Sequence, residues 1–208
     1  MVQLVSKLSS ICETTLTTNG FLLPAFAKDL AAAGLSRVNI SLDSLRDEVI
    51  QRVTRRNVSL DTVENAIDAA KNAGLTPVKV NCVVLEGINT GEIADMIHWA
   101  AAKGVVLRFI EHMPMEGSVC GYFSGDSILR EAGPVKYLHT SGTATMYETS
   151  EGLSFGIIAP VCTDMCRTCT RLRLTAEGEL LSCLAGGEAL DLKSLLRSGV
   201  SEDVIKKR

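Results

Sequence analysis

The feature that most constrains the fold is a repeated pattern of helix, glycine and strand. Three segments share it: AAAGLSRVNISLD (31–43), KNAGLTPVKVNCVVL (71–85) and AAKGVVLRFIEHMP (101–114). In each segment a helical stretch ends at a glycine, which suits the left-handed cap that closes many helices, and a β-branched run follows. Strands that alternate with helices in this way predict a parallel α/β sheet.

The residues before these glycines predict where the helices begin. Pro24 suits the first turn of a helix. Asp61 and Glu64 form a capping-box pattern, and Thr90 is placed to cap the third helix. The strands that follow read as almost continuously apolar, which is typical of buried parallel strands. A further strand before TTNG (17–20) would give four parallel strands.

Four strands are too few for a closed barrel, so we expect an open sheet or an incomplete TIM-type barrel. After Gly117 the pattern changes to shorter elements. They are a helix around 125–132, strands over 135–139, 144–148 and 154–159, a hairpin over 171–184 and a last helix near Leu190. The predicted fold is therefore α/β, with a partial barrel of parallel strands over 1–117 and a small α+β region over 118–208.

Composition excludes several classes of protein. The formal net charge is −3, which argues against a general nucleic-acid-binding protein, because such domains are usually basic. No apolar run reaches the roughly 18 residues of a membrane span. Residues 1–10 lack the apolar core of a signal peptide and instead read like the middle of an amphipathic helix. We therefore expect the chain to begin inside an element.

Four of the seven cysteines lie between residues 162 and 183. This crowding indicates metal binding in a reducing compartment rather than a disulfide framework. Cys166 and Cys169 are spaced to reach one metal ion or cluster, and the predicted hairpin returns Cys183 to them. Thiolates select zinc or iron–sulfur clusters. With Cys162 the set suits tetrahedral zinc, whereas three cysteines would leave one iron of a 4Fe–4S cluster open to a ligand.

Two arginines stand beside these cysteines. Arg171 and Arg173 are two residues apart on a predicted strand, so both should point to one face. Paired guanidinium groups suit phosphate or carboxylate. The alternative is a solvated strand face, or neutralisation of an anionic cluster.

Polar residues also fall along the predicted strands or at their carboxyl ends, where α/β sheets bind ligands. They are Thr17, Asn19, Ser41, Asp43, Lys79, Asn81, Arg108, Glu111, His112 and Met113. Asn19 also suits a simple turn, and Asp43 a helix cap. Lys79 and Arg108 are more informative, because a cation inside an apolar strand needs a partner. That partner is either an anionic ligand or an internal carboxylate.

Six motifs occur in order along the chain. They are LTTNG (16–20), AGLSRVNISLDSL (33–45), VTRRN (53–57), PVKVNCVVLEGIN (77–89), LRFIEHMPMEG (107–117) and CxxCxRLRLTAEGELLSCL (166–184). Together they resemble the GTP 3′,8-cyclase family of molybdenum-cofactor biosynthesis, whose members are radical S-adenosylmethionine (SAM) enzymes. The last motif is close to a family signature.

The resemblance implies a lyase that converts GTP to a cyclic pterin precursor through a deoxyadenosyl radical. It implies that Cys166, Cys169 and Cys183 hold a 4Fe–4S cluster whose open iron binds GTP. It implies GTP contacts at Thr17, Lys79, Arg171, Leu172 and Arg173, and SAM contacts at Ser41 and Met113. No residue is assigned a catalytic role.

The resemblance also sets expectations for partners and location. GTP is the expected ligand, and a cyclic pyranopterin synthase is the expected partner in the pathway. The sequence does not decide whether the protein forms a homodimer. Binding to nucleic acid or to a membrane is not expected. The expected location is a reducing compartment inside the cell, either the bacterial cytoplasm or the mitochondrial matrix.

The sequence departs from the family in several places. The N-terminal strand, the CxxxCxxC loop for the radical cluster and its SAM, the GGEP segment and the C-terminal glycine pair do not occur where the family has them. Cys162, Cys166 and Cys169 reproduce the CxxxCxxC spacing, but after the sheet rather than after its first strand. We therefore expect this chain alone not to start the radical reaction. Thr170 also replaces a usual Asn.

Two alternative functions stay open from the sequence. One is a four-cysteine zinc module, with Cys162 as the fourth ligand, that binds a nucleotide or a partner without catalysis. The other is a different radical-SAM enzyme with an auxiliary cluster, whose substrate would not need Arg171 and Arg173.

Overall fold

The computed structural model describes residues 1–113, 122–160, 169–183 and 188–205. The chain divides into two compact units, Met1–Thr163 and Asp164–Arg208. Within the described ranges, no helix is long and apolar enough to cross a membrane.

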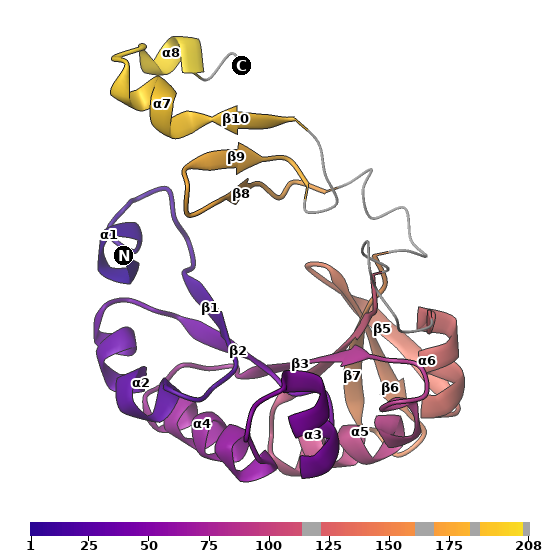
Figure 1. Cartoon of the computed structure of the whole chain (residues 1–208). Coiled ribbons are helices and arrows are strands. Elements are labelled where there is room, and N and C mark those ends of the chain that lie inside the picture. The colour runs from indigo at the N-terminus through magenta and orange to yellow at the C-terminus, as the bar shows by residue number, and fades with distance from the viewer. Residues whose placement is uncertain (114–121, 161–168, 184–187, 206–208) are drawn as a thin grey trace. The chain divides into compact units, whose positions relative to one another are not determined.

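The first unit consists of helices packed on one open sheet (Figure 1). Its elements are α1 (Val2–Val5), β1 (Thr15–Thr18), α2 (Leu23–Ala32), β2 (Arg37–Ser41), α3 (Asp47–Thr54), α4 (Leu60–Asn72), β3 (Lys79–Val84), η1 (Thr90–Glu92), α5 (Ile93–Ala102), β4 (Val106–Glu111), α6 (Gly125–Ala132), β5 (Val135–Ser141), β6 (Ala144–Thr149) and β7 (Ser154–Ile158). The seven strands have the order β1-β2-β3-β4-β7-β6-β5. Strands β1 to β4 and β7 are parallel, whereas β6 is antiparallel to both of its neighbours.

The four predicted parallel strands are confirmed, and the strand expected before TTNG is β1. Gly34, Gly74 and Gly104 have φ angles of 95°, 78° and 57°, in the region that favours glycine. Each of them follows a helix and precedes a strand, as the repeated pattern predicts. The α/β class with a mostly parallel sheet is therefore established, while the incomplete barrel stays a prediction because the sheet is open.

Two predicted helix starts are wrong. The capping box at Asp61 and Glu64 does not form, because α4 begins before Asp61. Glu64 instead accepts a hydrogen bond from Trp99 Nε1 at 2.9 Å and pairs with Lys103 at 2.7 Å, which ties α4 to α5. Thr90 does not cap α5 but lies in the 3₁₀ turn η1 that precedes it.

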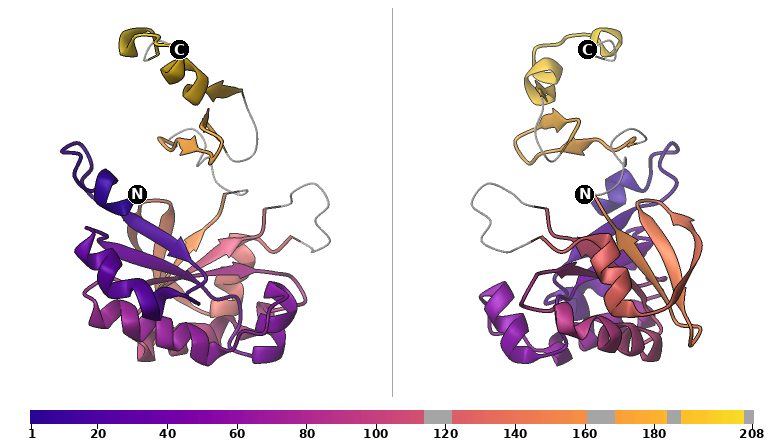
Figure 2. Two further views of the ribbon diagram at one scale, coloured as in Figure 1. Left: turned by 60° about the vertical axis from the view of Figure 1, so that its left-hand side comes forward. Right: turned by 90° about the vertical axis from the view of Figure 1, so that its right-hand side faces the viewer.

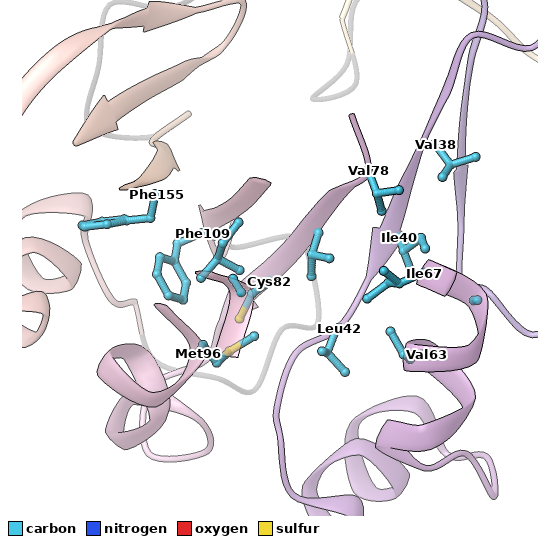
Figure 3. Packing of buried hydrophobic residues seen from close by; sticks show 14 of the residues in the cluster. Val38, Ile40, Leu42, Val63, Ile67, Val78, Cys82, Met96, Phe109 and Phe155 are labelled. Atoms are coloured by element: carbon cyan, nitrogen blue, oxygen red, sulfur yellow. The ribbon is translucent and has the colours of Figure 1, made fainter. Parts of the chain in front are cut away.

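The core lies between the sheet and the helices that cover one of its faces. Strands β2, β3 and β4 alternate between buried and more exposed residues, which corrects the expectation of continuously apolar strands. The buried residues shown in Figure 3 include Val38, Ile40, Cys82 and Phe109 from strands and Ile67 from α4. Helices α2, α4 and α5 lie along this face (Figures 1 and 2). The alternate residues of the same strands point to the other face.

The boundary predicted at 117/118 does not coincide with the compact units. Strand β7 pairs with β4 from Gly156 to Ile158, so that β5, β6 and β7 extend the first sheet. The compact units therefore divide between Thr163 and Asp164. The boundary at 117/118 stays a prediction about regions of the sequence. Helix α6 and the three strands after it lie where the sequence predicts them.

The second unit contains a small antiparallel sheet. Its described elements are β8 (Arg173–Leu174), β9 (Glu179–Leu181), β10 (Ala189–Asp191), α7 (Leu192–Arg197) and α8 (Glu202–Ile205). The strands have the order β10-β9-β8. The predicted hairpin is formed by β8 and β9, and Gly178 with a φ of 92° lies in its turn.

Candidate functional site

The sheet face opposite the core carries two rows of polar residues. Strand register aligns Thr17, Asn39 and Lys79 in one row and Ser41, Asn81 and Arg108 in the next. Residues aligned on neighbouring strands point to the same face. The predicted GTP contacts Thr17 and Lys79 are thus brought together, with Asn39 between them. Asn39 Nδ2 donates a hydrogen bond to Thr17 Oγ1 at 3.2 Å.

Arg108 lies at the centre of this face. Its Nε donates to Asn81 Oδ1 at 2.9 Å, and its Nη2 donates to Asn39 Oδ1 at 3.1 Å. Burial, followed by the charge of Arg37, lowers the pKa of the Arg108 guanidinium. Within the described part of the chain Arg108 has no carboxylate partner. The internal ion pair that the sequence left open is therefore not formed there.

Lys79, on the same face, also has no carboxylate partner among the described residues. Burial, followed by the charges of Arg37 and Arg108, lowers the pKa of its ammonium group. Glu13 raises that pKa only as the smallest contribution, because its two oxygens accept hydrogen bonds from Arg37 at 2.7 and 2.8 Å. The face thus holds more positive than negative charge, and an anion would relieve the repulsion between its cations.

A pocket of about 280 Å³ opens at the carboxyl ends of β1 and β2. Ser41, the predicted SAM contact, lines it together with Asn19 and Asp43. The remaining lining residues are mostly apolar: Phe21, Leu42, Ile50, Val53, Thr54, Arg56, Val58 and Val63. Met113, the other predicted SAM contact, follows β4 at the same edge of the sheet but is not among these residues.

Glu92 holds the chain segment that follows Ser41, a role that no sequence motif predicted. The carboxylate of Glu92 is buried, and it accepts hydrogen bonds from Ser44 Oγ at 2.8 Å and Leu45 N–H at 2.8 Å. It also pairs with Arg46 at 2.9 Å. Three successive residues of the β2–α3 connection are therefore held to η1, and they directly follow Asp43, which lines the pocket.

Two of the strand-end residues serve the fold. Asp43 Oδ1 accepts a hydrogen bond from Val83 N–H at 2.8 Å, and burial raises the pKa of its carboxyl group. Glu111 is buried and accepts hydrogen bonds from Gly125 N–H at 2.5 Å and Tyr122 O–H at 3.3 Å, so it anchors the start of α6.

The second unit carries two of the three predicted cluster ligands. Cys169 and Cys183 are exposed and lie on either side of the β8–β9 hairpin. Arg171 Nε donates to Cys169 Sγ at 3.1 Å. Hydrogen bonds from the backbone and then the side chain of Arg171 lower the pKa of the Cys169 thiol. A lowered pKa favours the thiolate, which is the form that binds metal.

Cys166 and Cys162 lie outside the described residues. Within the described ranges, no group of three or more His, Cys, Asp or Glu residues could hold a metal ion. Arg171, Leu172 and Arg173 are exposed, although only Arg173 belongs to strand β8. The predicted GTP contacts are therefore divided between the two units, with Thr17 and Lys79 in the first.

Two family models match consecutive parts of the chain, and the boundary between them differs from the boundary between the compact units. The model of the Radical SAM superfamily matches residues 1–100, and the Molybdenum Cofactor Synthesis C model matches residues 105–208. The chain belongs to the Molybdenum Cofactor Synthesis C family.

Two relatives of this Molybdenum Cofactor Synthesis C chain bear the same name. A GTP 3′,8-cyclase of Thermodesulfovibrio yellowstonii is 39% identical over 99% of this chain and 66% of its own length. One of Nautilia profundicola is 44% identical over 90% of this chain and 60% of its own length. These matches confirm the resemblance found in the motifs. The chain spans less than two thirds of these relatives.

A solved structure also aligns with part of the chain. The radical SAM methyltransferase from Sphaerobacter thermophilus covers 56% of this chain and 35% of its own, with 18% identity and a TM-score of 0.48.

Proposed function

We propose that this chain is the substrate-binding part of a GTP 3′,8-cyclase, a radical-SAM lyase of molybdenum-cofactor biosynthesis. The observation that carries the proposal is the pair of cations on the polar sheet face. Lys79 and Arg108 have no carboxylate partner among the described residues, and Thr17 lies on the same face. The phosphates of GTP supply the anion that these cations lack. The names of the relatives support GTP as the nucleotide.

The cysteine hairpin is the proposed site of a 4Fe–4S cluster. Cys169 and Cys183 fit this group, because both are exposed thiols and the pKa of Cys169 is lowered. Cys166 is the proposed third ligand. When bound, a three-cysteine cluster supplies one iron that is open to a ligand such as GTP. Arg171, Leu172 and Arg173 are proposed to hold GTP beside it.

The pocket at Ser41 is the proposed SAM site, with Met113 at the same sheet edge. In the whole enzyme, SAM bound in this pocket would supply the radical chemistry that the conversion of GTP requires. The role proposed for the 208 residues is the binding and orientation of GTP and SAM. A cyclic pyranopterin synthase would use the product. A reducing compartment, cytoplasmic or mitochondrial, and a homodimer are part of the same proposal.

Anaerobic reconstitution tests the cluster. The reconstituted chain should contain about four iron and four sulfide per molecule, and it should bind GTP in equilibrium dialysis. Cys169→Ser should lose most of the iron, whereas Cys162→Ser should keep it. Zinc without iron in the wild type, and loss of that zinc in Cys162→Ser, would support the four-cysteine zinc module instead.

The substrate is tested separately. Arg173→Ala should weaken GTP binding without changing the iron content, because the arginine is proposed to contact GTP rather than iron. Arg197→Ala is a matched control from helix α7 of the same unit. Equal GTP affinity in both variants and the wild type would favour a different radical-SAM enzyme with an auxiliary cluster.

A further inference from the structure

A second pocket, of about 290 Å³, opens on the polar face between β3–β4 and β5–β6. Its lining combines Lys79 and Arg108 with His139 and Ser141 of strand β5. The remaining lining residues are Pro77, Val106, Ala144 and Met146. None of the lining residues is acidic. Two cations, an imidazole and a hydroxyl around one cavity are a donor set suited to an anion with several oxygen atoms.

The sheet register explains why β5 reaches these cations. Arg108 aligns with Gly156, Gly156 with Met146, and Met146 with His139. Aligned residues point to the same face. His139 therefore shares the face of Arg108, although helix α6 lies between their strands in the chain.

Gly156 leaves the space that Met146 and Arg108, two lining residues of this pocket, occupy. A Cβ atom at this position would lie 2.9 Å from Met146 Sδ and 3.3 Å from Arg108 Cγ. Any side chain would push Met146 or Arg108 aside. The φ angle of Gly156 is not positive, so the glycine is required here by space rather than by backbone conformation. Arg108 of β4 and Met146 of β6 can therefore both pack against the backbone of Gly156.

The side chains of His139 and Ser141 can donate hydrogen bonds to a ligand. His139 and Ser141 are exposed, and their side chains have no hydrogen-bond partner among the described residues. Glu148, which follows Met146 by two residues on β6, is not among the lining residues. Nothing in the lining therefore neutralises the cations.

We propose that His139 and Ser141 of β5 contact the phosphate chain of the substrate from the wall opposite Lys79 and Arg108, in addition to the contacts that the family resemblance implies. The inference rests on the proposed function, since it takes a nucleoside triphosphate as the ligand. The phosphate oxygens accept hydrogen bonds from the His139 ring and the Ser141 hydroxyl on one wall. Lys79 and Arg108 neutralise the phosphate charge on the other wall.

The test compares three ligands on the full, anaerobically reconstituted chain by equilibrium dialysis: inorganic tripolyphosphate, GTP and guanosine. His139→Ala should weaken tripolyphosphate and GTP about tenfold, as expected for the loss of a hydrogen bond to a charged group. It should leave guanosine binding unchanged. His139→Gln keeps an N–H donor and should recover part of the affinity. Ser141→Ala should act in the same direction as His139→Ala.

His98→Ala is the matched control, because His98 is exposed on α5 and pairs with Glu151 rather than with the pocket. Unchanged tripolyphosphate binding in both His139→Ala and Ser141→Ala would overturn the inference. If Lys79→Gln nevertheless weakened GTP binding, the proposed function would stand while the inference about His139 and Ser141 would fail. An equal loss for guanosine and GTP would also overturn it, because the effect would not follow the phosphates. A wild type that binds neither GTP nor tripolyphosphate would contradict both proposals.

Discussion

At the scale of the residue, both the charge of Lys79 and its position on the polar sheet face indicate a contact with an anionic ligand. Burial and two neighbouring guanidinium groups disfavour its ammonium form, and an anion on the same face would restore that form. Lys79→Gln should therefore weaken GTP binding by about tenfold, while Lys79→Arg should retain much of the affinity. Equilibrium dialysis measures both, with Lys28→Gln on α2 as an exposed control. Equal affinity in Lys79→Gln and wild type would contradict the assignment.

Asp43 predicts a pH dependence of stability. Burial raises the pKa of its carboxyl group above the ordinary value of 3.8, so ionisation favours the unfolded chain. The stability that the protonated group contributes is complete below 3.8 and is lost as the pH rises through the higher native pKa. Asp43→Asn keeps the oxygen that accepts from Val83 N–H and removes the charge. The variant should be more stable than wild type at pH 7.

Urea unfolding at a series of pH values measures this effect. The difference in free energy of unfolding between Asp43→Asn and wild type should shrink as the pH falls toward 4. Asp68→Asn, exposed on α4, should show no such trend. A variant that is less stable than wild type at every pH would show that the charge of Asp43 is needed by the fold.

At the scale of the element, the connection between β2 and α3 depends on one buried carboxylate. Glu92→Ala leaves the Ser44 hydroxyl and the Leu45 N–H without their acceptor. The free energy of unfolding should fall by about 2–3 kcal/mol, as expected for buried polar groups left unpaired. Urea unfolding measures the loss, and Glu86→Ala in the exposed turn nearby is the control. A loss no larger than that of the control would mean that water replaces the carboxylate.

Most elements could be predicted from sequence because their signals are local. A glycine after a helix and a β-branched run after the glycine fixed β2, β3 and β4 to within a few residues. The capping box at Asp61 failed because it rests on a short pattern, and Glu64 finds stronger partners in Trp99 and Lys103 of another helix. Such tertiary contacts are invisible in the local sequence.

The candidate site was less predictable. The sequence predicted almost continuously apolar strands, but polar and apolar residues in fact alternate in RVNIS (37–41) and KVNCVV (79–84). This alternation indicates a sheet with one apolar face and one polar face. That signal would have found Arg37 and Asn39. No local pattern could have found His139, because it reaches Arg108 only through the order β4-β7-β6-β5, which joins distant segments.

At the scale of the whole molecule, the two units differ in what can stabilise them. The first has a continuous hydrophobic core. In the described part of the second unit, residues 169–183 and 188–205, the side chains whose exposure is given are exposed or half-buried, and none is buried. A unit with so little buried apolar surface needs another source of stability, such as a bound metal or cluster. The proposed cluster is therefore expected to stabilise the second unit and to leave the first unchanged.

Hydrogen exchange followed by mass spectrometry on the reconstituted chain, before and after removal of iron by a chelator, tests this expectation. Amides of β9 and β10 should lose protection when iron is removed, because their unit loses its main cross-link. Amides of β3 and β4 should exchange as before, because burial in the core protects them. Cys183→Ser should reproduce the effect of the chelator, and Cys12→Ser, an exposed cysteine of the first unit, should not. Unchanged protection of β9 and β10 without iron would show that the second unit is held by its own packing.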